Sequence, residues 1–333
     1  MTTEEVLSQY PIKPLFVSQI TVGLINETFK VSAMEGDFIL QRLNNIYDLR
    51  TIINVALIGK FLENQKFLAQ QTVWTKRGEC GVKEGERWWR LLTFIPGRVV
   101  EKIDCPKLAY EAGRIFGRFH VAMKNYNWVL HETPRVHDTR LHWKKFKKAI
   151  PKENGPEIEE MIKVIGHLPK LLLPTDLEPA ITHGDPKISN IVFGEPDNQA
   201  KALLDLDGCS KQNSVLVELG DAFRSWCASF EDDPNNCFDL EKFKNVWTGY
   251  LENASAMVPP EERLLVVQAI KLIILELASR FLRDYFEDCY FGWDKSRYPC
   301  RKAHNLARAK GQVTLYLNFL EKESEVAEII KNS

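Results

Sequence analysis

Three polar side chains in the middle of the chain have the types and the spacing that can hold a metal ion and accept a proton. Asp185 and Asn190 lie five positions apart, and Asp205 follows 20 positions after Asp185. A short loop can aim the Asp185 carboxylate at a substrate hydroxyl while the Asn190 amide turns back toward a metal. Magnesium prefers oxygen ligands and usually takes one or two carboxylates together with the phosphates of a nucleotide. The spacing therefore predicts a phosphoryl-transfer site.

The segment between Asn190 and Asp205 has the pattern of a β-hairpin. Apolar residues at 191–193 and 202–204 flank a turn rich in Gly, Pro, Asp and Asn at 194–198. Such a hairpin returns the chain to its start, so we expect Asp205 to lie beside Asn190. His183 precedes the loop, and we expect it to orient or pack behind the loop.

Lys187 comes two residues after Asp185. A fixed ammonium group at that place would stabilise the charge that spreads over a migrating phosphoryl group. An exposed loop lysine often only adds solubility, but this loop is the predicted site. We therefore predict a catalytic role for Lys187.

These motifs, with several others, make the chain resemble the aminoglycoside phosphotransferase and choline kinase superfamily. The closest likeness is to its N-acetylhexosamine 1-kinase-like branch. The resemblance also rests on residues 23–29, 38–42, 89–97, 112–120, 220–225 and 280–285. It implies an α+β, two-lobed, protein-kinase-like fold that binds ATP and Mg²⁺ between the lobes. The N-terminal lobe would be a small antiparallel sheet at 1–92, and the larger, mainly helical lobe at 93–333 would bind the substrate.

The apolar pattern along the chain agrees with a sheet lobe followed by a helical lobe. Strands are predicted at 20–23, 28–31, 38–41 and 88–95, whereas helices are predicted at 49–67 and 108–123. The remainder is mostly of helical pattern.

The loop after the first predicted strand is the expected phosphate contact. Gly23 gives its backbone freedom, so main-chain N–H groups there can approach ATP phosphates. Asn26 and Thr28 flank this loop and are predicted to contact the nucleotide with it. A single glycine can also be only a turn.

The third predicted strand departs from the superfamily pattern, which places a lysine there to pair with phosphates. Ile39 and Gln41 share one face by alternation and are the predicted nucleotide contacts, while Arg42 points the other way unless the strand bulges. A glutamine can donate a hydrogen bond to phosphate, but without the charge that strengthens it.

The fourth predicted strand ends at the expected hinge between the lobes. Thr93, Phe94 and Ile95 would present backbone donors and acceptors to adenine, and 96–97 (Pro-Gly) would let the chain leave the strand. An ordinary exit from a strand is an equally good interpretation without the flanking motifs.

Candidate acceptor contacts come from two later segments. Arg224 follows Asp221, which the pattern makes a helix N-cap, and Arg280 and Asp284 lie one turn apart. This mixture of charges suits a neutral sugar better than a polycationic aminoglycoside. A solvated helical face explains the second pair nearly as well.

Composition excludes several classes of protein. The 333 residues carry a net charge of −1, so no overall basic field recruits nucleic acid or an anionic membrane. Seven cysteines occur without a Cys-x-x-Cys pair, which is typical of reduced thiols in the cytoplasm. The first residues, Met1 to Val6, lack the pattern of a secretory signal. The oligomeric state is not predicted.

The sequence therefore favours a cytoplasmic small-molecule kinase that transfers the γ-phosphoryl group of MgATP to a hydroxyl, with an N-acetylhexosamine or related sugar as the preferred substrate. The alternatives are a choline, ethanolamine or aminoglycoside kinase, or a non-catalytic nucleotide-binding regulatory module. A protein kinase is disfavoured because 205–208 reads Asp-Leu-Asp-Gly and no Ala-Pro-Glu follows.

Overall fold

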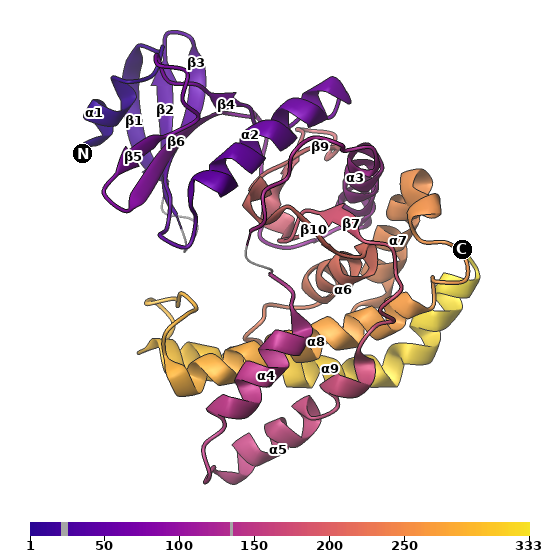
Figure 1. Cartoon of the computed structure of the whole chain (residues 1–333). Coiled ribbons are helices and arrows are strands. Elements are labelled where there is room, and N and C mark those ends of the chain that lie inside the picture. Colours follow the sequence, from indigo (N-terminus) through magenta and orange to yellow (C-terminus); the bar gives the residue numbers. More distant parts are fainter. Residues whose placement is uncertain (21–25, 134–135) are drawn as a thin grey trace.

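Strands with a mixed apolar and polar pattern build an antiparallel sheet in the first 93 residues of the computed structural model, which describes residues 1–20, 26–133 and 136–333 (Figure 1). The strands are β1 (Pro14–Ile20), β2 (Glu27–Ala33), β3 (Gly36–Arg42), β4 (Thr72–Val73), β5 (Val82–Glu84) and β6 (Arg87–Thr93). Their order is β1-β2-β3-β6-β4, and β5 pairs with β6.

Two helices accompany this sheet. The short α1 (Thr3–Leu7) buries Val6 and Leu7 with Leu40 and Leu91 of the sheet in a small core. The longer α2 (Leu49–Asn64) begins at Asp48, whose carboxylate accepts hydrogen bonds from backbone N–H groups of the first turn. Its apolar face joins the core of the second lobe, so α2 links the two parts.

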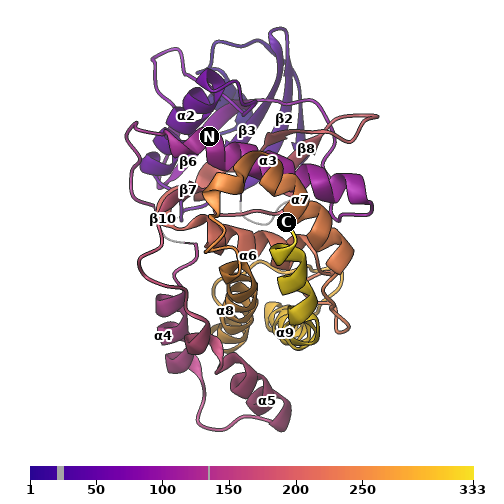
Figure 2. The same ribbon diagram turned by 90° about the vertical axis from the view of Figure 1, so that its right-hand side faces the viewer.

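The rest of the chain is mainly helical. Its helices are α3 (Pro106–Lys124), α4 (Thr139–Ala149), α5 (Pro156–Ile165), α6 (Val215–Trp226), α7 (Leu240–Ala254), α8 (Leu265–Glu287) and α9 (Arg301–Lys331). Figures 1 and 2 show α8 and α9 side by side, with α4 and α5 at the end farthest from the sheet.

Two short strand pairs lie between the sheet and the helices. The first joins β7 (Ala180–Thr182) to β10 (Ser210–Asn213), and the second joins β8 (Ile191–Phe193) to β9 (Ala200–Leu203). Short 3₁₀ turns η1 (Leu168–Leu171), η2 (Ile188–Asn190), η3 (Leu206–Gly208) and η4 (Ser255–Met257) complete the lobe.

The β8–β9 pair is tied to the N-terminal part of the chain at two points. Arg98 and Phe193 exchange backbone hydrogen bonds of 2.9 and 2.8 Å, and Ala69 forms a parallel bridge with Leu203. The chain passes very close at Gly97, which has φ 151° and whose added Cβ would lie 2.6 Å from the Phe193 carbonyl oxygen. Only glycine fits there without a shift of the backbone.

The predicted fold class, a small antiparallel sheet lobe and a larger helical lobe, is confirmed. The first strand lies at 14–20, earlier than predicted, and the helix expected to reach residue 67 ends at Asn64. The proposed boundary between residues 92 and 93 falls at the last residues of β6 and stays a prediction. No helix in the described ranges combines the length and the apolar character needed to cross a membrane.

Candidate active site

The predicted catalytic loop is held by its own hydrogen bonds. The Asn190 amide donates to the Asp185 backbone oxygen at 2.9 Å, and its nitrogen also lies 3.4 Å from the carboxylate Oδ2. Lys187 Nζ lies 2.7 Å from the same oxygen, with a side chain that is 56% exposed. The loop therefore brings the side chains of Asn190 and Lys187 to the Asp185 carboxylate.

Two glycines let this loop approach the turn that follows β9. Gly184 has φ 85°, and a Cβ on it would lie 2.4 Å from the Gly208 carbonyl oxygen. A larger residue would push the two segments apart. The two glycines therefore keep the Asp185 loop close to this turn.

The β8–β9 hairpin returns Asp205 to the loop, as predicted. The Leu204 backbone N–H donates to the Asn190 carbonyl oxygen at 2.8 Å. His183 Nε2 donates to the Leu204 carbonyl oxygen at 2.8 Å, and its buried ring packs against Phe116 and Phe119, so its predicted structural role agrees with its contacts.

The carboxylates of Asp185 and Asp207 lie close enough to Asp205 to act on its charge. Burial, together with the charges of Asp207 and Asp185, raises the pKa of Asp205 well above its usual range. Burial acts in the same direction on Asp207, but the Arg90 guanidinium outweighs it and lowers the pKa of Asp207. Negative charge thus exceeds positive charge, and a bound cation would stabilise the ionised Asp205.

This donor set fits magnesium. Among the described residues, no three His, Cys, Asp or Glu side chains converge to hold a metal by themselves. Magnesium usually keeps waters and phosphate oxygens and takes few protein ligands, so one carboxylate from Asp205 and one amide oxygen from Asn190 suffice.

Arg90 was not among the residues expected from sequence, and it lies at the centre of this site. It is 1% exposed, and it donates through Nη1 and Nη2 to both carboxylate oxygens of Asp207. Its Nε and Nη2 also donate to the Gln41 amide oxygen at 2.9 and 2.7 Å. The signal in the sequence is weak, since it requires the register that pairs Gln41 with Arg90.

Glu218 of α6 is a second unexpected residue. Its carboxylate accepts hydrogen bonds from the backbone N–H groups of His183 at 3.0 Å and Gly184 at 2.6 Å. His120 Nε2 lies 2.6 Å away, and His120 Nδ1 lies 2.9 Å from the Tyr250 hydroxyl. Glu218 therefore holds the backbone just before Asp185.

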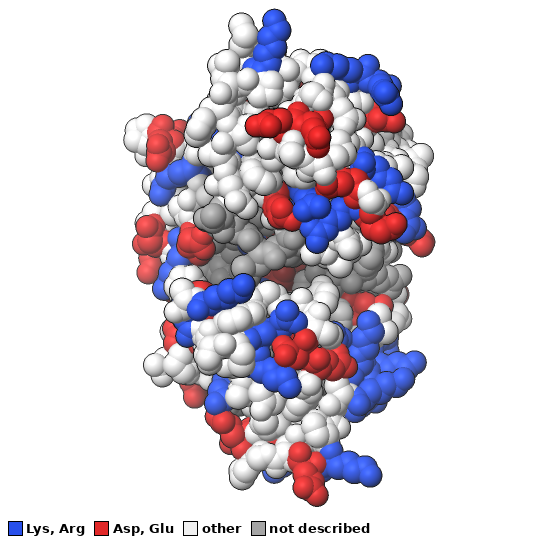
Figure 3. Space-filling model, turned by 90° about the vertical axis from the view of Figure 1, so that its left-hand side faces the viewer, with Lys and Arg blue, Asp and Glu red and all other residues white. Residues whose placement is uncertain are grey.

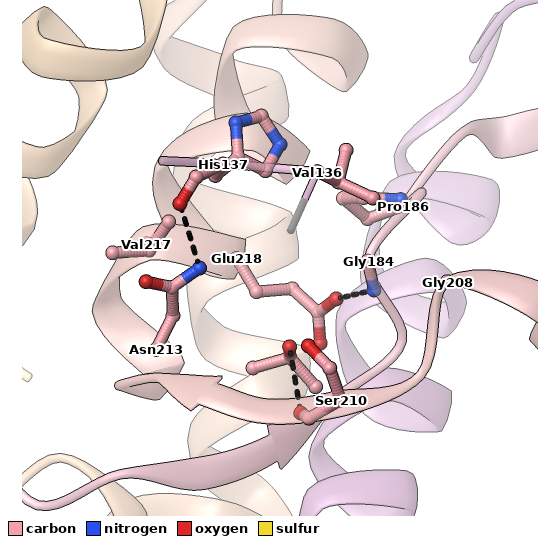
Figure 4. Close-up of a pocket in the computed structure, with 10 residues that line it drawn as sticks. Val136, His137, Gly184, Pro186, Gly208, Ser210, Asn213, Val217 and Glu218 are labelled. Atoms are coloured by element: carbon pink, nitrogen blue, oxygen red, sulfur yellow. Dashed lines mark hydrogen bonds between the residues drawn. The ribbon is translucent and has the colours of Figure 1, made fainter. Parts of the chain in front are cut away.

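Figure 4 shows this arrangement at a small cavity behind the loop, with the dashed bond from Gly184 to Glu218. Gly208, Ser210 and Asn213 also line this cavity. Burial acts to raise the pKa of Glu218, but His120 and the backbone N–H groups outweigh it and hold the pKa below its usual range. The carboxylate stays ionised and keeps its three donors.

Outside the hinge, the residues predicted to contact the nucleotide lie on β2, on β3 and in the loop before β2. Gly23 lies outside the described residues. Asn26 Oδ1 accepts from the Asn44 backbone N–H at 2.9 Å, and the Thr28 hydroxyl lies 3.4 Å from Gln41 Nε2. Ile39 shares a face with Gln41 and packs against the core of the second lobe.

Gln41 and Arg42 point to opposite sides of β3, as predicted. The Gln41 amide oxygen accepts hydrogen bonds from Arg90. The predicted hydrogen bond to a phosphate would therefore come from Gln41 Nε2. Arg42 pairs with Glu27 at 3.3 Å and Glu84 at 3.0 Å on the outer side of the sheet. Arg42 is thus held away from the cleft.

The hinge residues offer part of what was predicted. Thr93 uses its own N–H and carbonyl oxygen within the sheet lobe, with Gln71 and Gln70, and the Phe94 N–H donates to Asp37. Neither the Phe94 carbonyl oxygen nor the Ile95 N–H bonds to any part of the chain that the structure describes. One acceptor and one donor of the predicted hinge are therefore without a partner among the described residues.

One prediction about α6, the helix cap at Asp221, is wrong. Asp221 is no N-cap, because α6 begins at Val215 after Ser214. Asp221 instead lies within the helix and pairs with His137 at 3.3 Å and with Arg224 at 2.8 Å. Arg224 is buried and spans Asp221 and Glu231, and its predicted contact with the substrate stays a prediction.

Asp284 is likewise a structural residue. Its two oxygens accept from the backbone N–H groups of Cys289, Tyr290 and Phe291 at 2.8–2.9 Å and from Asn305 at 2.7 Å. These bonds hold the chain where it leaves α8. The predicted contact of Asp284 with the substrate stays a prediction.

Arg280, one turn earlier, pairs with Glu276 at 3.7 Å and donates to the Val136 carbonyl oxygen at 3.3 Å. Its guanidinium also lies over the Phe291 ring. Among the described residues, Arg280 makes fewer hydrogen bonds than Arg224 or Asp284.

The surface is hollowed between the two lobes on the face seen in Figure 3. Lysine, arginine, aspartate and glutamate are interspersed on both sides of this hollow. The surface around it therefore carries both signs of charge.

Three solved structures with a similar fold are distant from this chain in sequence. Amicoumacin kinase hAmiN, solved with AMP-PNP, Ca²⁺ and Ami, is 14% identical, with a TM-score of 0.66 over 94% of this chain and 96% of its own. The microcompartment-associated aminopropanol kinase is 15% identical, with a TM-score of 0.62 over 95% and 96%. Choline kinase from Cryptosporidium parvum is 14% identical, with a TM-score of 0.60 over 96% and 94%. At these identities the likeness shows the fold.

A family model provides the assignment that the fold alone does not. The model of the phosphotransferase enzyme family matches residues 17–239, which is about two-thirds of the chain and includes the loop, the hairpin and the hinge. The chain therefore belongs to the phosphotransferase enzyme family.

Proposed function

We propose that this protein is a small-molecule kinase that transfers the γ-phosphoryl group of MgATP to a hydroxyl group. The observation that carries the proposal is the convergence of Asp185, Asn190 and Asp205 at one point through the β8–β9 hairpin. Their geometry fits an acid-base group beside a magnesium site. A cytoplasmic location, where MgATP is abundant, is part of the proposal.

Asp185 is the group that accepts the proton of the acceptor hydroxyl or orients that hydroxyl. Asn190 and Asp205 would hold Mg²⁺, which neutralises phosphate charge when it is bound. The free Phe94 carbonyl oxygen and Ile95 N–H would receive adenine. The two hinge groups have no partner among the described residues, whereas Asp185 is paired with Lys187.

Lys187 would stabilise the transferring phosphoryl group. Desolvation favours its neutral form, but the Asp185 carboxylate outweighs this effect and raises the pKa of Lys187 to about 12. The ammonium is therefore charged at neutral pH. In this proposal it moves from Asp185 to the phosphate when nucleotide binds, which also releases Asp185 for the acceptor.

The preferred acceptor is an N-acetylhexosamine or related sugar. This choice rests on the resemblance of the sequence to that branch of the superfamily, and Arg280 is the candidate acceptor contact. An amino alcohol is the second candidate, because similar folds occur in kinases named for aminopropanol and choline. A polycationic aminoglycoside suits the site less, since Lys187 stands beside Asp185.

One screen tests the proposal. ADP release would be measured with sugars, amino alcohols and aminoglycosides, each with and without Mg²⁺, and with the Asp185→Asn variant as the control. We expect one acceptor class to stimulate ADP release, and we expect the variant to lose on the order of 10²-fold or more in kcat. Stabilisation by MgATP without turnover on any acceptor would instead favour a nucleotide-binding regulatory module.

A further inference from the structure

A buried arginine connects the nucleotide side of the site to its metal side. Arg90 lies on β6, and its guanidinium bonds to Gln41 of the neighbouring strand β3 and to Asp207 of the turn η3. The Arg90 and Asp207 side chains are 2% and 1% exposed. The pair therefore links the sheet of the first lobe to the turn that follows Asp205.

This arrangement holds both oxygens of Asp207. Both of its carboxylate oxygens accept from Arg90, which is the planar two-point contact that only arginine makes. The neighbouring Asp205 has φ 62°, a left-handed conformation that costs free energy in a residue other than glycine. An anchored neighbour is needed to keep such a backbone in place.

Gln41 restrains Arg90 from the other side. Its amide oxygen accepts from both Nε and Nη2, so the guanidinium plane is fixed by two residues. Removing Arg90 would leave the buried Asp207 carboxylate without any cation among the described residues, two positions from Asp205. That carboxylate would then repel Asp205 or compete with it for a metal.

We propose that Arg90 is a positioning residue for the metal site, which through Asp207 fixes the turn that presents Asp205. The inference rests on the proposed function, because it assigns the metal to Asp205 and Asn190.

The test measures metal affinity directly. Calorimetry with Mg²⁺ and ADP, and separately with ADP in EDTA, would compare the wild type with Arg90→Lys, which keeps the charge but loses the planar contact. Loss of a residue that orients a metal ligand typically weakens metal binding about 10- to 100-fold. We expect a loss in that range for Mg²⁺, with the affinity for ADP in EDTA changed by less than about threefold on the same reasoning.

Arg87→Lys is the matched control. Arg87 lies on the same strand and also contacts a carboxylate and an amide, those of Glu27 and Asn45, but on the exposed side of the sheet. Its replacement should leave the affinities for Mg²⁺ and ADP unchanged. Gln41→Met is the second test variant. It removes the hydrogen bonds of Gln41 to Arg90 and keeps the buried ion pair of Arg90 with Asp207. We expect this variant to lose Mg²⁺ affinity, but less than Arg90→Lys does.

The outcomes separate the two proposals. Equal Mg²⁺ affinity in wild type and Arg90→Lys, with only a lower melting temperature in the variant, would overturn the positioning role. An equal loss of ADP affinity in EDTA would overturn it too, because Arg90 would then be a phosphate ligand. If Arg90→Lys does not fold, unchanged Mg²⁺ affinity in Gln41→Met overturns the inference. A wild type that binds ADP but no Mg²⁺ would overturn the proposed function together with the inference.

Discussion

Replacing Glu218 with glutamine tests whether the backbone before Asp185 must be held in place. The best glutamine orientation keeps an oxygen toward His183 and His120 and turns its amide NH₂ toward the Gly184 N–H, which donates at 2.6 Å in the wild type. A buried donor left unpaired costs about 1–3 kcal/mol, and the two remaining bonds lose their charge assistance at about 1 kcal/mol each. Relief of the buried charge offsets part of this sum. We expect a loss of about 3 kcal/mol in the free energy of unfolding.

The same change should lower kcat. A displacement of about 1 Å in a reacting group costs on the order of 10²-fold in rate, so a loosened Gly184 should reduce kcat about 10- to 100-fold. The KM for ATP should change little, because the hinge is untouched. Steady-state ADP release with the acceptor found in the screen measures the kinetics, and urea unfolding measures the stability.

Glu111→Gln provides a matched control. Glu111 is also buried, accepts a backbone N–H from Ala200 at 3.0 Å and pairs with Arg114 and Lys107, but it contacts the far end of the β8–β9 hairpin. It should lose stability without losing kcat. A Glu218→Gln enzyme with wild-type kcat and reduced stability would refute the positioning role and leave Glu218 as a stabilising residue only.

Further predictions concern the metal ligand, the cations and a buried histidine. Asp205→Ala should abolish the Mg²⁺-dependent part of ATP binding, and unchanged MgATP affinity by calorimetry would contradict its assignment. Lys187→Met should lower kcat with little effect on the KM for ATP, because the contact strengthens as charge migrates, while Arg42→Met should have a small effect since Arg42 is paired outside the cleft. Small and equal effects of both substitutions in steady-state kinetics would show that neither cation stabilises the phosphoryl group. Burial acts to lower the pKa of His137, but two buried carboxylates outweigh it and raise the pKa from 6.5 to about 9. Protonated His137 therefore contributes up to about 3 kcal/mol of stability that is present below pH 6.5 and is lost as the pH rises through about 9. Urea unfolding at pH 6 and pH 10 should show a larger fall in the wild type than in His137→Asn, and parallel falls would contradict the assignment.

Features that depend on neighbours in sequence were predicted well. The loop from Asp185 to Asn190 and the hairpin that returns to Asp205 each use short spacings and local turn residues, so few alternative structures compete. The opposite directions of Gln41 and Arg42 follow from strand alternation alone. These predictions needed no knowledge of distant contacts.

The unexpected residues depend on partners far along the chain. Arg90 meets Asp207 across 117 positions, and Glu218 meets Gly184 across 34, so neither contact has a local signal. Asp221 has the type of residue that begins a helix, but its partner His137 lies 84 positions away and stabilises it inside α6. Tertiary contacts thus overrode the local preference.

The two bridges that join the β8–β9 hairpin to Ala69 and Arg98 bear on how such a molecule can open. The bridge from Ala69 joins the hairpin to the first lobe, and atoms near such a link move least when one lobe rotates against the other. Asp205 lies two residues after the end of β9, so such a rotation displaces it little, while the parts of the lobes farthest from the hairpin travel most. If the proposed function holds, the metal end of the site would keep its shape while the lobes open and close around it.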